Sequence, residues 1–289
     1  MASWMIGNIS VDRVAEIEGP LFPPKGVFPD FDPAILQRHW ADLVPDHYAA
    51  DLGLVIGAVQ TYVLRTPDHT ILIDTGCGNH KQRPGDPPFH NLNTAYLERL
   101  NDLGVVPEDV DLVFLTHLHV DHVGWNTKLE NARWVPTFPN ATYVFTQTEL
   151  DVVKRTRPTD KQVEPLNYYL DSIAPVIASG QARVLSAEIE LAPGLDIVFT
   201  PGHSPGHAML RAQSQGQAAL FVGDVVQHPL QVYRPDWNSN YCAQPDAAVA
   251  TRHLVLGECA ERHCLMFAAH FAGPYGVHIR RDADGFALV

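Results

Sequence analysis

Four apolar segments of this chain, each with the composition of a buried β-strand, run directly into histidine or aspartate residues. The segment 112–115 precedes THLHVDHVG (116–124), while LDIVFT, ALFVG and CLMFAA precede His203, Asp224 and His270. In layered α/β proteins the ends of strands are rigid, and the loops beyond them can face one cleft. The pattern therefore favours a sheet protein in which the strand ends bring these side chains together.

The remaining sequence predicts further strands and helices that alternate in two similar halves. The run 55–78 reads as two strands joined at Pro67–Asp68, and 141–146 and 275–289 also have strand composition. Helical patterns occur at 91–105, 147–156, 160–180 and 245–263. We expect one domain over residues 1–289, made of sheets covered by helices, with residues 1–50 as an N-terminal arm. Within that arm, the proline-rich segment 20–33 is expected to be extended over the surface.

Composition excludes several classes of partner. The formal net charge is −13 and the pI is near 5.5, which argues against binding to nucleic acid or to an anionic membrane. No window is apolar over 18 residues, and the N-terminus lacks the basic start and apolar run of a signal peptide. Four cysteines without a CxxC pair are typical of a reducing compartment, so we expect a cytoplasmic protein.

Histidine and aspartate at the four strand ends indicate a metal centre. Imidazole nitrogen and carboxylate oxygen suit Zn²⁺, and the same donors can hold Mn²⁺, Co²⁺ or Fe²⁺. The candidate ligands are His117, His119, Asp121, His122, His203, Asp224 and His270. Seven donors are enough for two ions per chain that share a carboxylate and a water-derived hydroxide. A lone histidine is more often structural, so eight others are interpreted as surface or core residues: His39, His47, His69, His80, His90, His253, His263 and His278.

The same motifs resemble those of the metallo-β-lactamase superfamily. HLHVDH matches its HxHxDH motif, TPGHSPGH its second histidine loop, VGDVV its bridging aspartate, and AAHF its last histidine. The resemblance spans roughly residues 50–275 and implies a four-layer αββα sandwich of the α/β (α+β) class. By position, one ion takes His117, His119 and His203, while the other takes Asp121, His122 and His270, with Asp224 bridging. Asp74, in ILIDTG, corresponds to an early aspartate that supports the metal loop.

Within this superfamily the sequence looks most like N-acyl homoserine lactonases of the quorum-quenching kind and methyl parathion hydrolase-like enzymes. One position departs from the lactonases, because Gln227, followed by His228, stands where they carry a tyrosine that polarises the lactone carbonyl. Gln227 can still donate a hydrogen bond to a substrate, and loop solvation is the alternative interpretation of both residues. Five aromatic residues are candidates either for an apolar pocket or for the core: Phe22, Phe28, Trp125, Phe138 and Trp237.

These observations lead to one expected function and three alternatives. We expect a zinc-dependent hydrolase that opens neutral lactones through a bridging hydroxide, with Asp121 or Asp224 relaying a proton to the leaving group. Hydrolysis of organophosphate triesters or other esters is the first alternative. Nucleic-acid processing is disfavoured by the charge, and a redox or metal-binding protein without hydrolytic activity is the last alternative. By resemblance we also expect a homodimer.

Overall fold

The computed structural model describes residues 4–156, 168–273, 275–283 and 285–289. The chain divides into two compact units. Unit 1 comprises Met1–Glu16 and Val59–Ala187, and unit 2 comprises Ile17–Ala58 and Glu188–Val289. Both boundaries near the N-terminus fall inside strands, because β2 covers Ile9–Phe22 and β4 covers Leu54–Arg65. The prediction of one domain with an arm at residues 1–50 stays a prediction.

Unit 1 is built on a mixed sheet with the strand order β1-β2-β4-β5-β6-β9-β10, and β3 pairs with the part of β4 that belongs to unit 2. Strands β5, β6, β9 and β10 run parallel to one another, whereas β4 pairs with β5 antiparallel. The strands not yet bounded are β1 (Trp4–Ile6), β3 (Tyr48–Ala49), β5 (Thr70–Ile73), β6 (Leu112–Phe114), β9 (Thr142–Thr146) and β10 (Ala182–Leu185). A separate hairpin joins β7 (Thr127–Glu130) to β8 (Arg133–Pro136).

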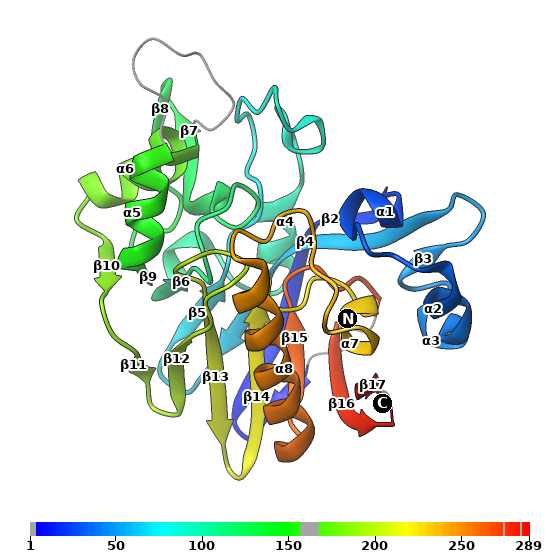
Figure 1. The fold of residues 1–289 in the computed structure, drawn as a ribbon. Coiled ribbons are helices and arrows are strands. Elements are labelled where there is room, and N and C mark those ends of the chain that lie inside the picture. Colours follow the sequence, from blue (N-terminus) through cyan, green and yellow to red (C-terminus); the bar gives the residue numbers. More distant parts are fainter. Residues whose placement is uncertain (1–3, 157–167, 274, 284) are drawn as a thin grey trace. The chain divides into compact units, whose positions relative to one another are not determined.

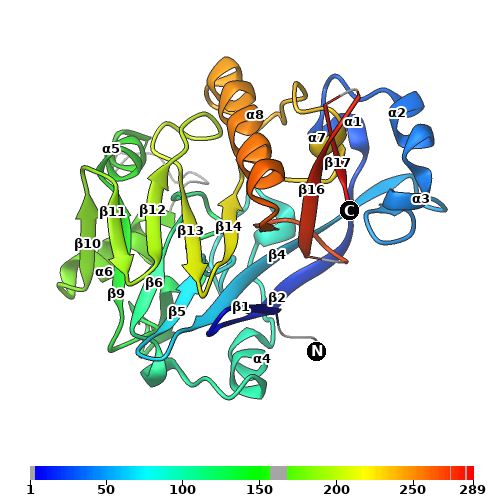
Figure 2. The same cartoon turned by 90° about the horizontal axis from the view of Figure 1, so that it is seen from below.

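Helices bury the core of unit 1 against this sheet (Figures 1 and 2). They are α4 (Tyr96–Asp102), α5 (Gln147–Thr156), a π-helical turn at Tyr169–Ile173 and α6 (Ala174–Ala178), with short 3₁₀ turns at Pro87–Phe89, Pro107–Asp109 and Gly124–Asn126. Tyr96 and Leu100 of α4 and Leu150 of α5 pack with Val113 of β6 and Tyr143 of β9. The edge of parallel strands β5 and β6 at their carboxyl ends is thereby held rigid, and the histidine-rich loop leaves from it.

Unit 2 contains a second mixed sheet with the order β11-β12-β13-β14-β15-β16-β17, in which β14 and β15 form the parallel pair. Its strands are β11 (Ile189–Ala192), β12 (Leu195–Phe199), β13 (Ala208–Ser214), β14 (Gln217–Gly223), β15 (Leu265–Ala268), β16 (Gly276–Asp282) and β17 (Gly285–Leu288). Helix α8 (Pro245–Arg262) packs on β14 and β16, as Figure 2 shows, and its Val255, Leu256 and Cys259 join the apolar cluster with Val222 and Met266.

The N-terminal part of unit 2 corrects one expectation. The proline-rich segment 20–33 was predicted to be extended over the surface, but residues 20–22 end strand β2, and Pro24–Val27 forms helical turn α1. Phe28 is fully buried in a cluster with residues of α2 (Pro33–Arg38), α3 (Trp40–Leu43) and α7 (Leu230–Tyr233). The prolines start helices here, because Pro24 and Pro33 stand at first-turn positions where no backbone N–H is needed.

The other predicted elements agree with the structure where it describes them. The helix expected at 147–156 is α5, that at 245–263 is α8, and the strands before the four ligand groups are β6, β12, β14 and β15. The helix expected over 160–180 is present at residues 169–178, as a π-helical turn followed by α6, while residues 160–167 lie outside the described part.

Candidate metal centre

The loop after β6 sends histidines to one side and apolar side chains to the other. His117 and His122 alternate with Leu118 and Val123, which are buried in the core of unit 1. The backbone N–H of Leu118 also donates to the Glu149 carboxylate (Oε2, 3.0 Å). The hydrophobic residues between the histidines therefore anchor the loop, and they leave the imidazoles on the opposite side.

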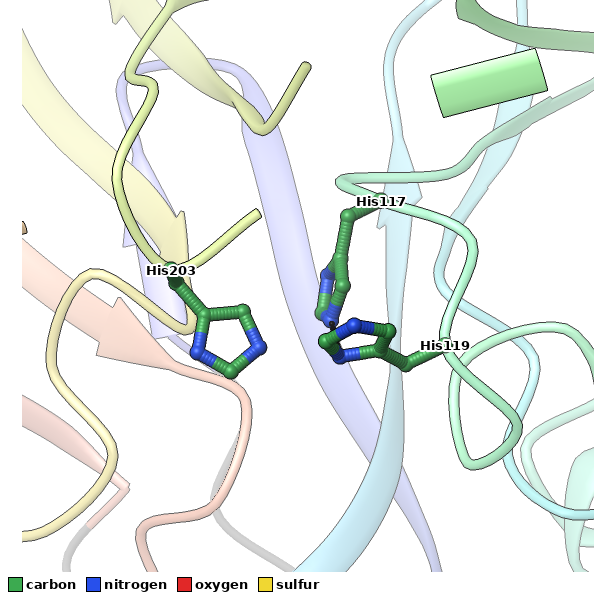
Figure 3. A group of neighbouring side chains, drawn as sticks. All are labelled: His117, His119 and His203. Atoms are coloured by element: carbon green, nitrogen blue, oxygen red, sulfur yellow. Dashed lines mark hydrogen bonds between the residues drawn. The ribbon is translucent and has the colours of Figure 1, made fainter. Parts of the chain in front are cut away.

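Two histidines of this loop bring ring nitrogens together. Nε2 of His117 lies 2.9 Å from Nδ1 of His119. Two nitrogens can be this close when both bind the same zinc ion, each at about 2.0–2.1 Å. Figure 3 draws the rings of His117 and His119 turned toward each other.

Asp74 organises the same loop from the end of β5. Its Oδ1 accepts from the backbone N–H of Thr116 (2.8 Å), and its Oδ2 lies 2.8 Å from Nδ1 of His122. A carboxylate only accepts, so His122 donates through Nδ1, and its Nε2 is the nitrogen available to a metal. Asp74 has a left-handed backbone (φ 57°), a sparsely populated conformation for a residue with a side chain. Its hydrogen bonds hold that conformation in place.

Unit 2 supplies a second set of donors around Asp224, which follows β14. Oδ2 of Asp224 lies 3.3 Å from Nε2 of His203, and Oδ1 lies 3.1 Å from Nε2 of His270. Nδ1 of His270 lies 2.8 Å from the carbonyl oxygen of Ala58, to which it donates. One carboxylate thus presents an oxygen to each of two histidines, as a carboxylate shared by two ions does.

A further histidine, His207, holds Asp224 in position and was not singled out from the sequence. It is buried; its Nε2 accepts from the backbone N–H of Asp224 (3.1 Å), and its Nδ1 lies 2.7 Å from Oγ1 of Thr200. The only sequence signal was the second histidine of TPGHSPGH, four residues after His203. Spacing alone does not separate a ligand from a residue that supports one.

Gln227 and His228 are both buried, so solvation of a surface loop does not account for them. Nε2 of Gln227 donates to Oδ2 of Asp224 (2.7 Å), and its backbone N–H donates to Oε1 of Gln231 (2.7 Å). His228 lies 2.9 Å from the carbonyl oxygen of His47, and burial lowers its pKa to about 3. Gln227 therefore contacts the candidate ligand Asp224, whereas His228 is a neutral histidine of the core.

Glu16 supports the loop after β5 and carries no motif in the sequence. Its carboxylate accepts from the backbone N–H of Cys77 (2.5 Å), from Oγ1 of Thr94 (3.0 Å) and from Nε1 of Trp125 (2.7 Å). Burial raises the pKa of Glu16, while these hydrogen bonds act to lower it. A buried acid so far from its partners in sequence can be recognised only once the fold is known.

The aromatic residues considered for a pocket belong mainly to the core. Phe138 and Trp125 lie in the apolar cluster of unit 1, and Trp125 also stacks on Tyr96, with ring centroids 5.0 Å apart. Phe28 and Trp237 lie in a cluster of unit 2, against which Phe22 is partly buried. Their burial is explained by packing, so they support the core interpretation.

The donor set fits divalent transition metals. All seven predicted ligands are among the described side chains that could hold an ion, and they offer only imidazole and carboxylate donors. For His122 and His270 the ring nitrogen facing away from the site is engaged by Asp74 and by the Ala58 carbonyl, respectively. Fixing the far nitrogen is how proteins orient histidine ligands.

Comparison with known proteins agrees with these features. The family model described as the metallo-beta-lactamase superfamily matches residues 54–259. The chain belongs to this superfamily. The metallo-β-lactamase fold expected from the sequence is thereby confirmed, and a solved structure, that of hydrolase AbOPH in the beta lactamase superfamily, has the same fold, with a TM-score of 0.78 at 24% identity over 99% of this chain and 96% of that one.

Lactonases are among the relatives of this member of the superfamily, as its motifs predicted. N-acyl homoserine lactonase AiiB of Agrobacterium fabrum is 30% identical over 184 residues, which are 57% of this chain and 62% of the relative. The match thus spans less than two thirds of that relative's length. The structure of AidC, a dizinc quorum-quenching lactonase, has a TM-score of 0.78 at 20% identity, covering 100% of this chain and 96% of that one. In the described residues, no helix is both long and apolar enough to span a membrane.

Proposed function

We propose that this protein is a metal-dependent hydrolase that opens neutral lactones of the acyl homoserine lactone type. The main support for this proposal is the position of Asp224, whose two carboxylate oxygens lie 3.3 Å from His203 and 3.1 Å from His270. The sequence relationship to named lactonases supports the choice of reaction. The net charge of −13 favours an uncharged substrate over an anionic one.

The proposed site takes donors from both units. In this proposal His117, His119 and His203 would hold one Zn²⁺, Asp121, His122 and His270 would hold the other, and Asp224 would serve both. Mn²⁺, Co²⁺ and Fe²⁺ suit the same donors. Bound ions of this kind would supply a water acidified toward neutral pH and a Lewis acid for the substrate's carbonyl oxygen. The residues themselves fix the donors, exclude solvent and move one proton.

Asp121 is the better of the two candidates for moving that proton. Both oxygens of Asp224 face histidines, and Oδ2 also accepts from Gln227. The Asp224 side chain is 3% exposed, whereas that of Asp121 is 17% exposed. A carboxylate that exchanges a proton with the alkoxide of an opened lactone needs access to it. We therefore assign proton transfer to Asp121 and positioning of the donors to Asp224.

Gln227 takes a structural role in this proposal. Its amide donates to Asp224 at 2.7 Å and its backbone is tied to Gln231, so it fixes the carboxylate. The buried amide replaces the tyrosine of the lactonases, so bound ions would supply the polarisation of the carbonyl. We also propose that the protein works in the cytoplasm as a homodimer, without nucleic-acid or membrane partners. Light scattering at several concentrations tests the dimer.

The decisive experiment compares two substrates on one metal-replete preparation. We expect kcat/KM for an N-acyl homoserine lactone to exceed that for the phosphotriester paraoxon by tenfold or more, which corresponds to about 1.4 kcal/mol. Preference for paraoxon by that factor would replace the lactone with a phosphotriester as substrate. Absence of hydrolysis on both, together with an iron centre absorbing visible light, would favour redox function instead.

A further inference from the structure

The end of helix α8 brings two cysteines into contact. Residue His263 has a left-handed backbone (φ 50°), and its N–H donates to the carbonyl of Cys259. The N–H of Cys264 donates to the same carbonyl at 3.3 Å. Bonds of this kind close a helix in the Schellman arrangement, which places the side chain after the left-handed residue against one in the last helical turn. Here both side chains are thiols, and their sulfur atoms are 3.6 Å apart.

This contact has a plain structural explanation. An apolar contact commonly accompanies such a helix end, and a free cysteine behaves as a small hydrophobic residue. Both thiols belong to the apolar cluster of unit 2, consistent with that role. A disulfide has an S–S bond of about 2.05 Å, so the two sulfur atoms here are only about 1.5 Å farther apart than in a disulfide. Side-chain rotation alone can cover a distance of that size.

We propose that Cys259 and Cys264 form a reversible disulfide site, oxidised by low-molecular-weight disulfides such as oxidised glutathione. In the first step the thiolate of one cysteine attacks the glutathione disulfide, forming a mixed disulfide and releasing one glutathione thiolate. The second cysteine, after losing its proton to solvent, attacks the protein sulfur of the mixed disulfide and releases the other glutathione. Two protein thiols are thus oxidised to one disulfide, and one glutathione disulfide is reduced to two glutathione thiols.

The surroundings of the pair suggest which thiol reacts first. The hydrogen bond with Cys259 and the charge of Arg262 lower the pKa of Cys264, although burial opposes them. The hydrogen bond with Cys264, together with burial, raises the pKa of Cys259. Cys264 is therefore the attacking thiolate and Cys259 the resolving thiol. Because both are buried while residues 261–263 are exposed, the reagent reaches the pair when the last turn of α8 opens.

The chain offers a direct readout of this bond. Trypsin cleaves after Arg252, Arg262 and Arg280, so Cys259 and Cys264 fall in the separate peptides 253–262 and 263–280. Full-length protein is equilibrated with reduced and oxidised glutathione, quenched with acid, blocked with N-ethylmaleimide and digested. We expect these two peptides to be joined, with a mass two hydrogens below their sum. Dithiothreitol should separate them, and Cys264→Ser should abolish the joined species.

The same equilibrium is measured in concentrated urea, where the protein is unfolded. This measurement shows how much of the tendency to form the disulfide comes from nearness in sequence alone and how much from the native structure. If the helix end positions the thiols, the equilibrium constant for forming the bond should be at least tenfold larger in native protein than in unfolded protein. An equal or smaller constant in the native state would overturn the proposal, because the fold would then not favour the bond. Cys77→Ser is the matched control, since Cys77 lies in unit 1 and its substitution should leave the constant unchanged.

Discussion

The two units contribute candidate ligands in different ways. In unit 1, four donors come from the six residues His117–His122, which form one loop after β6. In unit 2, three donors come from separate loops after β12, β14 and β15, and two of them, His203 and His270, face the third, Asp224. The first set is therefore local in sequence, whereas the second is assembled by the sheet.

The supports of the two sets differ as well. In unit 1 they are side chains, since Asp74 binds His122 and Glu149 holds the backbone of Leu118. In unit 2, His270 donates to the backbone carbonyl of Ala58, while the side chains of Gln227 and His207 hold Asp224. The unit 1 set therefore depends on Asp74, which binds His122, and the unit 2 set depends on Asp224, which faces His203 and His270.

The largest effect is expected for Asp224→Ala. Removing the carboxylate that faces both His203 and His270 should lower kcat/KM for lactone by about 10³-fold or more, equal to about 4 kcal/mol. Asp224→Glu keeps the charge and serves as the matched variant, with activity between the two. Steady-state kinetics on metal-replete protein checks this. Loss of less than tenfold in Asp224→Ala would show that the unit 2 donors do not depend on this residue.

The two units also differ in the groups that bind their buried positive charges. In unit 1, Asp171 accepts two hydrogen bonds from Arg83, at 2.7 Å each, and lies 3.5 Å from Nζ of Lys81. In unit 2, the buried Arg252 is bound by carbonyl groups instead, including those of Val225 and Pro235.

Asp171→Asn should therefore destabilise the protein strongly. It leaves two buried cations without their carboxylate, which costs about 3–5 kcal/mol in the free energy of unfolding. Glu130→Gln is the matched control, because it breaks an exposed ion pair with Lys128 (2.8 Å) and should cost at most about 1 kcal/mol. Urea unfolding of both variants measures the difference. Equal stabilities would refute the importance of this buried cluster.

Asp74→Asn tests the side-chain support of unit 1. The amide cannot accept as the carboxylate does at both Thr116 and His122, so metal affinity should fall about 10–100-fold. His207→Ala is the corresponding change in unit 2, and it should weaken affinity less, since the group of Asp224 that it binds is the backbone N–H. Competition with a chelator ranks the two variants. A larger loss of metal affinity in His207→Ala than in Asp74→Asn would contradict this expectation.

The smallest effect concerns acid stability and the neutral histidines of unit 2. Burial lowers the pKa of His228 to about 3 and that of His47 to about 4, from 6.5 in the unfolded chain. Between pH 6.5 and 4 the unfolded state binds more protons, so stability is full above pH 6.5 and falls as pH is lowered. Each histidine contributes up to about 1.4 kcal/mol per pH unit. In metal-free protein, His228→Gln should make the unfolding free energy less dependent on pH below pH 6.5, by up to about 1.4 kcal/mol per pH unit. An unchanged pH dependence would contradict the low pKa of His228.

The sequence predicted one part of the site better than another, for physical reasons. HLHVDH could be interpreted because its donors are adjacent in the chain, and its strand β6 is a short apolar run. His203, Asp224 and His270 were found because each follows an apolar strand. Glu16 and His207 were missed because their contacts join segments distant in sequence or are made with backbone groups. The proline-rich segment was mispredicted because prolines in first helical turns favour helix starts.

In the proposed site, the loop of unit 1 and the three loops of unit 2 bind two ions. Elemental analysis of metal-replete protein tests it most directly, with His119→Ala and His270→Ala measured in parallel as one variant from each unit. We predict close to two transition-metal ions per chain in the unaltered protein and close to one in each variant. A single ion in the unaltered protein, or two ions retained in both variants, would contradict a two-ion site that uses these ligands.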